Sequence, residues 1–276
     1  MEHKEFQIKT TDGLNLFAQV WLTKKPAKAL VVIVHGLGEH SSRYDHVAKI
    51  FNEQEFNVFA FDLRGHGRSE GPLGRIPSYA QLNKDITSAV AFAKQEYGKD
   101  QPVFLYGHSL GASAVLYCGL LPDLDLNGII ATSPSMDISS TSKVKILLAK
   151  ILNPLMPGFT MASGLDANSL SHDKTVVEAY KNDPLVHDQV SVRLGRYIMQ
   201  AGELVAKQAS NWYLPLLVMH GTEDRLCGIK GTDAFMELLK GDITYKRWEG
   251  LYHETHNEPE KEYVIQFMVD WIKAHI

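Results

Sequence analysis

Five short apolar runs, separated by segments with helical periodicity, limit the folds that are open to this chain. Each run has the length of a buried strand, and each intervening segment can form a helix that carries the chain back to the start of the next strand. The pattern therefore predicts a parallel sheet with crossover helices. The runs cover residues 30–34, 57–61, 103–106, 128–131 and 216–220.

The first 22 residues follow a different pattern. Residues 6–10 and 14–22 alternate between apolar and polar side chains around Asp12-Gly13, which is a turn dipeptide. This arrangement predicts an antiparallel hairpin at the start of the sheet. In the parallel part of a sheet, ligands bind beyond the carboxyl ends of the strands. The residues that follow each apolar run are therefore the place to look for chemistry.

One stretch interrupts the alternation. From about Met136 to Leu185 the sequence shows no strand-like run, but it contains several prolines and an amphipathic segment between Val144 and Leu155. We interpret this stretch as a helical cap inserted over the strand ends. The expected organisation is one domain, with a core of residues 1–135 and 186–276 and a cap insertion of residues 136–185.

The composition is that of an ordinary globular protein, with 45% hydrophobic and 22% charged residues in a chain of 276. The formal net charge of -4 offers no basic stripe for phosphates, so nucleic acid is not an expected partner. With only two cysteines and no long apolar stretch at the start, we expect a cytoplasmic protein. The longest apolar runs, 29–34 and 214–219, are too short to cross a bilayer.

The segment Gly107-His108-Ser109-Leu110-Gly111 has the form G-x-S-x-G and lies in the context that this motif requires. A strand-like segment precedes it, and a helix-like segment continues it. A serine on such a strand-to-helix turn has a strained backbone, and glycine is needed on both sides because larger side chains would collide. The turn exposes the hydroxyl of Ser109, which we predict to be a nucleophile. The alternative is a glycine-flanked serine that only caps a helix.

A serine hydroxyl needs a base, and the fold that carries this turn supplies its partners in the order serine, acid, histidine. Asp224 follows the last of the five runs, and His253 follows an expected further strand. We predict that Asp224 orients His253. Glu223 is the competing acid, and His256, one helical turn after His253, is the competing base. The other histidines near this end of the chain are interpreted as structural or exposed: His220 and His275.

The oxyanion hole of such an enzyme needs two backbone donors. The N–H of Leu110 lies at the predicted helix start, where it can stabilise a developing oxyanion. The second donor is expected from the loop His35-Gly36-Leu37-Gly38, and we assign the N–H of Leu37. The alternative for this loop is a turn without a role in binding. Residues 62–69, which are rich in charge and glycine, are expected to brace it through a polar network.

Four motifs of the core and one stretch of the cap look like signatures of a single family. They are His35-Gly-Leu-Gly-Glu-His-Ser-Ser-Arg-Tyr44, Gly65-His-Gly-Arg-Ser-Glu-Gly71, Gly107-His-Ser-Leu-Gly111, Gly221-Thr-Glu-Asp-Arg-Leu-Cys227 and residues 173–185. The sequence resembles the monoacylglycerol lipase family, and more broadly the lysophospholipase-like hydrolases. The resemblance extends from about Phe6 to Trp271. It implies an α/β-hydrolase fold, with a mostly parallel central sheet, flanking helices and an inserted helical cap.

The resemblance also implies roles outside the triad. In that family, the residues matching Glu39, Arg43 and His256 line the exit where glycerol binds, although Glu39 and Arg43 would also make an ordinary surface ion pair. The apolar cap helix of the family touches lipid surfaces, as residues 144–155 would do here; the alternative is packing against the core. Family members with a cysteine at the position of Cys227 are sensitive to thiol reagents.

We therefore predict a serine carboxylester hydrolase that releases fatty acid and glycerol from monoacylglycerols through an acyl-enzyme on Ser109. The nearest alternative is a lysophospholipase or a short-chain carboxylesterase with the same triad. An alternative of another class is a non-catalytic hydrolase-fold binding protein, which would usually have lost one of the three residues. No metal or organic cofactor is expected, because the sequence shows no ligand cluster. The expected partners are a lipid ester and, transiently, a membrane surface.

Overall fold

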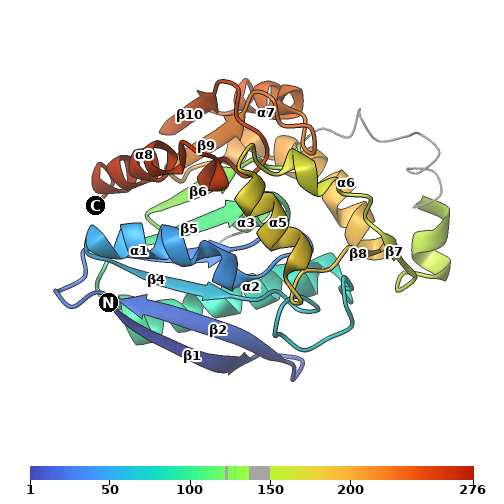
Figure 1. The fold of residues 1–276 in the computed structure, drawn as a ribbon, viewed down its shortest axis with the longest axis horizontal. Coiled ribbons are helices and arrows are strands. Elements are labelled where there is room, and N and C mark those ends of the chain that lie inside the picture. Colours follow the sequence, from blue (N-terminus) through green and yellow to red (C-terminus); the bar gives the residue numbers. More distant parts are fainter. Residues whose placement is uncertain (122–123, 137–149) are drawn as a thin grey trace.

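The computed structural model describes residues 1–121, 124–136 and 150–276. In these residues eight strands form one sheet in the order β1-β2-β4-β3-β5-β6-β9-β10 (Figure 1). From β4 to β10 every neighbouring pair is parallel, whereas β2 is antiparallel to both β1 and β4. The strands are β1 Glu2–Lys9, β2 Asn15–Leu22, β3 Ala29–Val34, β4 Phe56–Phe61, β5 Val103–His108, β6 Gly128–Thr132, β9 Leu216–Gly221 and β10 Ile243–Trp248. The predicted mostly parallel sheet and its N-terminal hairpin are confirmed.

Helices cover both faces of the sheet, which explains the uninterrupted apolar runs. All six residues of β3 are buried, as expected for a central strand with a core on each side. One core contains residues of α2, α3, α6 and α7, and the other contains residues of α1 and α8. The α-helices that lie wholly within the described residues are α1 Asp45–Glu53, α2 Tyr79–Ala93, α3 Leu110–Cys118, α5 Lys174–Asn182, α6 Val192–Ala206, α7 Ile229–Met236 and α8 Lys261–Lys273. The short helices are η1 Ser41–Tyr44, η2 Lys94–Gly98, η3 Ala167–Ser169, η4 Ala209–Asn211 and η5 Thr255–Asn257.

Polar residues fix the starts of several helices. The Ser78 hydroxyl accepts a hydrogen bond from the backbone N–H of Gln81, and Ser191 caps α6 in the same way. In α5 the Asp173 carboxylate accepts from the N–H of Thr175. Each cap satisfies a backbone donor that the first turn of a helix leaves unpaired. These caps determine where α2, α5 and α6 begin.

The described residues 150–191, between β6 and α6, lie over the carboxyl ends of the strands, where a cap was predicted (Figure 1). An amphipathic segment was expected at 144–155. Residues 144–149 of this segment lie outside the described residues, and residues 150–155 are helical. The expectation of no strand in this stretch is wrong, because β7 (Thr160–Ala162) pairs antiparallel with β8 (Gln189–Ser191). Three residues are too few to show an alternating pattern. This pairing crosses residue 185, so the domain boundary there stays a prediction.

In the part of the chain that the structure describes, no helix combines the length and the hydropathy that a bilayer span requires.

Candidate active site

Ser109 lies on a tight turn between β5 and α3. Its backbone has φ 54° and ψ -115°, a conformation that a non-glycine residue rarely adopts. A Cβ atom on Gly107 would lie 2.5 Å from the carbonyl oxygen of Gly111, and a Cβ atom on Gly111 would lie 2.1 Å from that of Val34. The two glycines of the motif are therefore required by close backbone packing. The turn presents the Ser109 hydroxyl at the carboxyl edge of the sheet.

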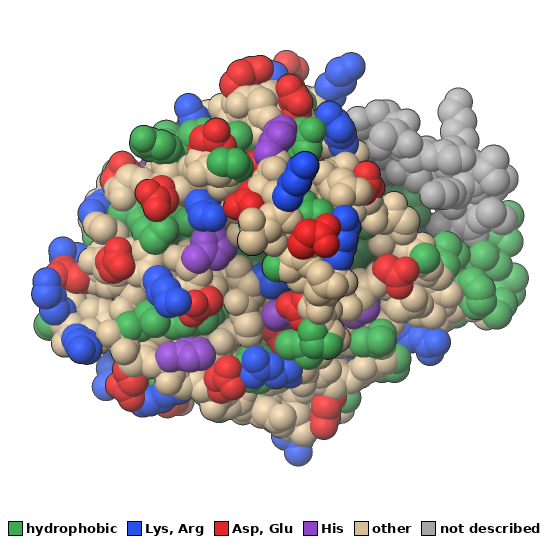
Figure 2. Space-filling model, in the orientation of Figure 1, with side chains coloured by type: hydrophobic (Ala, Val, Ile, Leu, Met, Phe, Trp, Pro, Cys, Tyr) green, Lys and Arg blue, Asp and Glu red, His purple; other side chains and the backbone are tan. Residues whose placement is uncertain are grey.

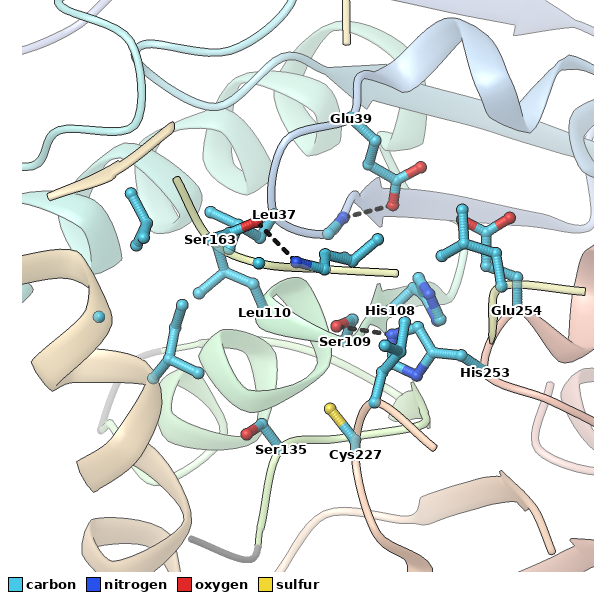
Figure 3. A pocket seen from close by; sticks show the side chains of 18 of the residues that line it. Leu37, Glu39, His108, Ser109, Leu110, Ser135, Ser163, Cys227, His253 and Glu254 are labelled. Atoms are coloured by element: carbon cyan, nitrogen blue, oxygen red, sulfur yellow. Dashed lines mark hydrogen bonds between the residues drawn. The ribbon is translucent and has the colours of Figure 1, made fainter. Parts of the chain in front are cut away.

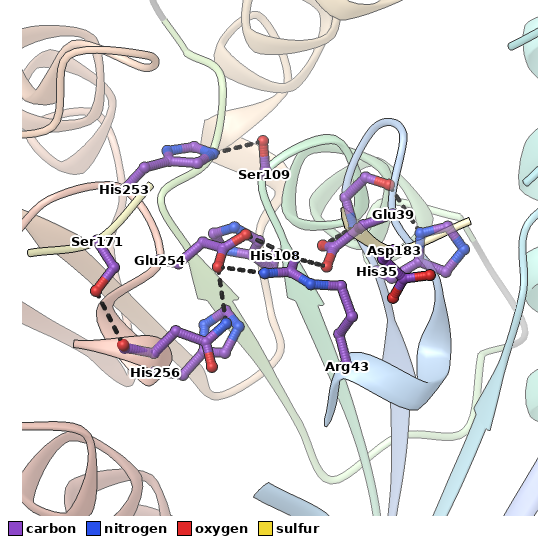
Figure 4. A network of polar contacts seen from close by, with 12 residues as sticks. His35, Glu39, Arg43, His108, Ser109, Ser171, Asp183, His253, Glu254 and His256 are labelled. Atoms are coloured by element: carbon purple, nitrogen blue, oxygen red, sulfur yellow. Dashed lines mark hydrogen bonds and ion pairs between the residues drawn. The ribbon is translucent and has the colours of Figure 1, made fainter. Parts of the chain in front are cut away.

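A chain of hydrogen bonds joins Ser109, His253 and Asp224, and Figures 3 and 4 show its Ser109–His253 part. The Oγ of Ser109 lies 2.9 Å from Nε2 of His253, and Nδ1 of His253 lies 2.7 Å from Oδ2 of Asp224. Because a carboxylate can only accept, the proton of the imidazole is on Nδ1 and Nε2 is free to accept from the serine. The Ser133 hydroxyl donates to the carbonyl of His253 at 2.6 Å and so fixes its backbone. This is the geometry of an activated nucleophile.

Asp224 is held as a charged group. Besides the bond from His253, its Oδ2 accepts from Nε2 of His220 at 3.0 Å, and its Oδ1 accepts from the N–H groups of Leu226 and Cys227. Burial opposes the charged form, but the charge of His253 and the hydrogen bonds from both histidines hold the pKa of Asp224 well below its usual range. His220 therefore has a structural role as a support for the carboxylate.

His253 has the environment of a base. Burial lowers the pKa of His253, but the charge and hydrogen bond of Asp224 outweigh it, so the pKa is raised above the usual histidine value. The ring of His108 lies 4.8 Å from that of His253. Burial lowers the pKa of His108 to about 3, so this neighbour stays neutral. The geometry therefore allows His253, rather than His108, to receive a proton from Ser109.

The competing acid and base lie elsewhere. Glu223 makes a backbone bond to Leu251, and no described hydrogen bond joins its carboxylate to His253. His256 is buried, and its ring stacks on that of Tyr44 at 5.0 Å. Neither ring nitrogen of His256 has a hydrogen-bond partner among the described residues. The structure therefore brings Asp224 and His253, rather than these alternatives, to Ser109.

Two backbone N–H groups are available for an oxyanion. Leu37 and Leu110 both line the cavity at Ser109, and Leu110 begins α3. Neither N–H donates to another group of the described residues. The N–H of Gly36 donates to Oε1 of Glu39 at 2.7 Å, and a Cβ atom on Gly36 would lie 2.8 Å from that oxygen. This tight loop holds the backbone of Leu37 beside the nucleophile.

The polar network expected to brace this loop is present. Oδ1 of Asp62 accepts from the N–H and the hydroxyl of Ser41 at 2.7 and 2.6 Å, and Oδ2 accepts from the N–H of Arg68. Nε2 of His35 accepts from the N–H of Leu63 at 2.8 Å. The loop after β3 and the loop after β4 are therefore one connected unit.

A cavity of about 320 Å³ opens over Ser109 (Figure 3). Its volume is at the lower end of the range for ligand sites. Next to the nucleophile its wall is polar, with Glu39, His108, His253 and Glu254. The rest of its wall is mostly apolar and comes largely from the cap segment and α6: Leu165, Leu170, Val190, Gly195, Ile198, Met199 and Leu226. The arrangement can hold an apolar chain at one end and a polar group at the other.

The residues expected at the head group occupy different positions. Glu39 is among the described residues that line the cavity, whereas Arg43 and His256 are not. The role of all three at the glycerol exit stays a prediction. The Arg43 guanidinium bridges two carboxylates, with Nη1 at 2.5 Å from Oε2 of Glu39 and at 2.7 Å from Oε1 of Glu254 (Figure 4). Its Nη2 reaches Oε2 of Glu254 at 2.7 Å. A buried guanidinium requires such partners.

Glu254 is the functional candidate that the sequence reasoning missed. It lines the cavity and is 2% exposed. Burial opposes its charge, but the charge and hydrogen bonds of Arg43 hold the pKa of Glu254 well below its usual range. The one signal in the sequence was its position directly after His253. Its partner Arg43 lies 211 residues away, so nothing local reveals the pair.

The cap segment is bonded to the loops that form the site. The N–H of His187 donates to the carbonyl of Gly38 at 2.9 Å, and Nε2 of His40 lies 2.9 Å from Oδ2 of Asp183. On the other side, the N–H of Glu254 donates to the carbonyl of Leu170. These contacts connect residues 170–187 to both the oxyanion loop and the histidine loop.

Neither cysteine is part of a ligand cluster in the described chain. Cys227 lines the cavity, and burial raises the pKa of its thiol far above the usual range. Cys118 is buried in α3, where burial raises the thiol pKa to about 12. Among the residues that the structure describes, no group of three or more His, Cys, Asp or Glu side chains could hold a metal ion.

The sheet and the Ser109–His253–Asp224 arrangement define a serine hydrolase of the α/β-hydrolase fold. The family model Hydrolase_4, described as "Serine aminopeptidase, S33", matches residues 25–260. The chain is 32% identical over 267 residues to a monoacylglycerol lipase of Mycolicibacterium smegmatis, covering 96% of this chain and 95% of that protein. It belongs to the monoacylglycerol lipase family of α/β hydrolases and is a carboxylic ester hydrolase.

Two further comparisons agree with this assignment. The crystal structure of a monoacylglycerol lipase from Paleococcus ferrophilus has a TM-score of 0.87 and 35% identity, covering 95% of this chain and 99% of that one. The chain is also 38% identical over 271 residues, or 97% of its length, to an uncharacterized abhydrolase domain-containing protein of Dictyostelium discoideum. It spans only 28% of that longer protein. The predicted family and fold are confirmed.

Proposed function

We propose that this chain hydrolyses monoacylglycerols to fatty acid and glycerol, with Ser109 as nucleophile, His253 as base and Asp224 as the residue that orients the base. The observation that carries the proposal is the hydrogen-bonded chain from Asp224 through His253 to Ser109, at the junction of an apolar and a polar part of one cavity. The relatives named monoacylglycerol lipases support the substrate.

The reaction has two steps. His253 takes the proton of Ser109 as Oγ attacks the ester carbonyl, and the oxyanion is stabilised by the N–H groups of Leu37 and Leu110. The protonated His253 then gives its proton to the glycerol oxygen as the carbon–oxygen bond breaks and the acyl-enzyme forms. In the second step His253 activates water, which attacks the acyl-enzyme and releases the fatty acid. Asp224 stabilises the imidazolium throughout.

The cavity suits such a substrate. The acyl chain lies along the apolar wall from the cap segment and α6, and the glycerol hydroxyls donate to the carboxylates of Glu39 and Glu254. Arg43 does not line the cavity, but its ion pairs with Glu39 and Glu254 hold both carboxylates in position. His256 has no access to the cavity and supports the site by stacking on Tyr44.

We also propose that the cap touches a lipid surface transiently. Large apolar side chains are exposed on it, and they gather at one edge of the molecule (Figure 2): Ile151, Leu155, Met156, Phe159 and Met161. An apolar patch of this kind suits delivery of a poorly soluble substrate.

Both cysteines are free thiols, which supports the cytoplasmic location expected from the sequence.

The test is fatty acid release from 1-monooleoylglycerol, a diacylglycerol and a lysophospholipid by the wild type and a Ser109→Ala variant. Release from the monoacylglycerol that is lost in the variant supports the proposal. If the enzyme prefers the lysophospholipid, or hydrolyses only short esters, the proposed substrate is wrong but the triad assignment stands. If the folded wild type hydrolyses no ester, the chain is a non-catalytic binding protein with a hydrolase fold.

A further inference from the structure

The charged residues that line the cavity have one sign. When His253 is unprotonated, Glu39 and Glu254 are the charged side chains among the described residues of the wall. No lysine or arginine is present among these residues. Both carboxylates are close to fully buried, at 2% exposure each. They lie in the polar part of the cavity, near the nucleophile (Figure 3). Under the proposed function, this part receives the alcohol that leaves in the first step.

Both carboxyl groups act only as hydrogen-bond acceptors in their contacts. Glu39 accepts from the N–H of Gly36, the hydroxyl of Tyr44 and the guanidinium of Arg43. Glu254 accepts from both Nη atoms of Arg43 and from Nδ2 of Asn257 at 2.7 Å. Every partner is a donor, so neither carboxyl group has a contact that needs its proton.

The charges do not cancel. Arg43 provides one positive charge for two carboxylates, as Figure 4 shows, and it lies outside the cavity. The other imidazole on this wall, that of His108, has its pKa lowered by burial to about 3 and adds no charge. When His253 is neutral, as the reaction requires, Asp224 behind it is a further negative charge. The polar part of the cavity therefore has a net negative charge with little water to screen it.

We propose that this negative wall selects esters with uncharged head groups and rejects those with a phosphate in the head group, and that Glu254 is a specificity-determining residue. The inference rests on the proposed function, because it assigns this part of the cavity to the alcohol side of the ester. A glycerol hydroxyl can donate to either carboxylate. A phosphate finds no cation among the described residues of the wall and meets a like charge. At an effective dielectric of about 20, two charges about 6 Å apart repel enough to slow a reaction about 100-fold.

The experiment compares two soluble esters that differ in one group, 1-butyrylglycerol and 1-butyrylglycerol 3-phosphate. The quantity measured is the ratio of their kcat/KM values, which does not depend on the fraction of active enzyme. The wild type should prefer the neutral ester about 100-fold. Glu254→Gln removes one charge and should reduce this ratio about tenfold or more. Glu249→Gln, an exposed residue that changes the total charge equally, should leave it unchanged.

Glu39→Gln provides the same test if Glu254→Gln does not fold, because it removes the other negative charge. Equal hydrolysis of both esters by the wild type would overturn the charge selection. An unchanged ratio in a folded, active Glu254→Gln would overturn the role of that residue. Failure of the proposed function looks different: 1-monooleoylglycerol would not be hydrolysed, whereas the ratio for the butyryl pair would still be measurable and would decide the inference by itself.

Discussion

The Nε2 atom of His253 lies 2.9 Å from the Oγ atom of Ser109, although 144 residues separate them in the sequence. Each comes from the carboxyl end of a different strand, and the sheet brings the two ends together. A histidine in this position accepts the serine proton only when its ring is neutral. The activity of the enzyme should therefore report the protonation of His253.

We predict an acidic limb in the pH profile of kcat/KM. His253 is protonated below its pKa and cannot act as a base, so activity falls tenfold per pH unit as the pH drops through that pKa. Because Asp224 raises the pKa of His253, the limb should lie above the usual histidine value of about 6.5. A soluble short-chain ester, assayed from pH 5 to 9, measures it. A limb below pH 6 would contradict the assigned electrostatics.

Removal of the orienting carboxylate tests the same pair. Asp224→Asn abolishes the charge that raises the pKa of His253, so the acidic limb should move to lower pH. The value of kcat should fall about 10⁴-fold, because the amide favours the wrong tautomer of the imidazole. Glu223→Gln, the neighbouring acid, should change neither quantity appreciably. The assignment fails if Glu223→Gln has the larger effect.

The backbone at the nucleophile turn predicts a marked difference between two glycine substitutions. Gly111→Ala places a Cβ atom 2.1 Å from the carbonyl oxygen of Val34, so the backbone must shift, and we expect a loss of about 3 kcal/mol in the free energy of unfolding. In Gly195→Ala the nearest atom is 3.7 Å away, and helix propensity should stabilise the protein by up to about 1 kcal/mol. Urea unfolding measures both. Similar values for the two variants would show that the turn tolerates a side chain.

The hydrogen bond between the cap segment and the oxyanion loop should affect turnover. Asp183→Asn weakens the contact with His40, which holds the loop that contains Leu37. We expect kcat to fall about tenfold with little change in KM, because a misplaced N–H donor affects the transition state more than substrate binding. The exposed Asp188→Asn is the matched control. A change confined to KM would indicate that the cap acts only in substrate binding.

The thiol of Cys227 should be unreactive in the folded enzyme. Burial raises its pKa, and the nearby charge of Asp224 does so further, so little thiolate exists at neutral pH. Iodoacetamide should modify it about 100-fold more slowly than in the urea-unfolded chain. Peptide mass spectrometry of samples taken at successive times measures the rate of modification in the folded and in the unfolded chain. Rapid inactivation by modification of Cys227 would show that the sensitivity to thiol reagents known in the family applies here.

The fold was largely predictable because most strands of the sheet are buried and continuous. The run at 30–34 became β3 (Ala29–Val34), and the run at 216–220 became β9 (Leu216–Gly221). Ser109, Asp224 and His253 were predictable because each directly follows a strand, or its short turn, at the edge where ligands bind. The short pair β7 and β8 was not, since three residues carry too little pattern.

The polar wall of the cavity could not be derived from local sequence. A spacing of three residues suggested that His253 and His256 share a helical face. In the structure Glu254 has non-helical backbone angles and η5 begins only at Thr255, so the two rings diverge. The importance of Glu254 depends on Arg43, which is distant in the sequence, and on the burial of both, which only the tertiary structure determines.

Covalent labelling tests the central role of Ser109 most directly. A long-chain alkyl fluorophosphonate should add once to the wild type, and peptide mass spectrometry should place the adduct on Ser109. The labelled enzyme should no longer hydrolyse 1-monooleoylglycerol, and Ser109→Ala should remain unlabelled, while the exposed Ser210→Ala is labelled normally. An adduct on another residue, or full hydrolysis by enzyme labelled at Ser109, would contradict the assignment of Ser109 as the nucleophile.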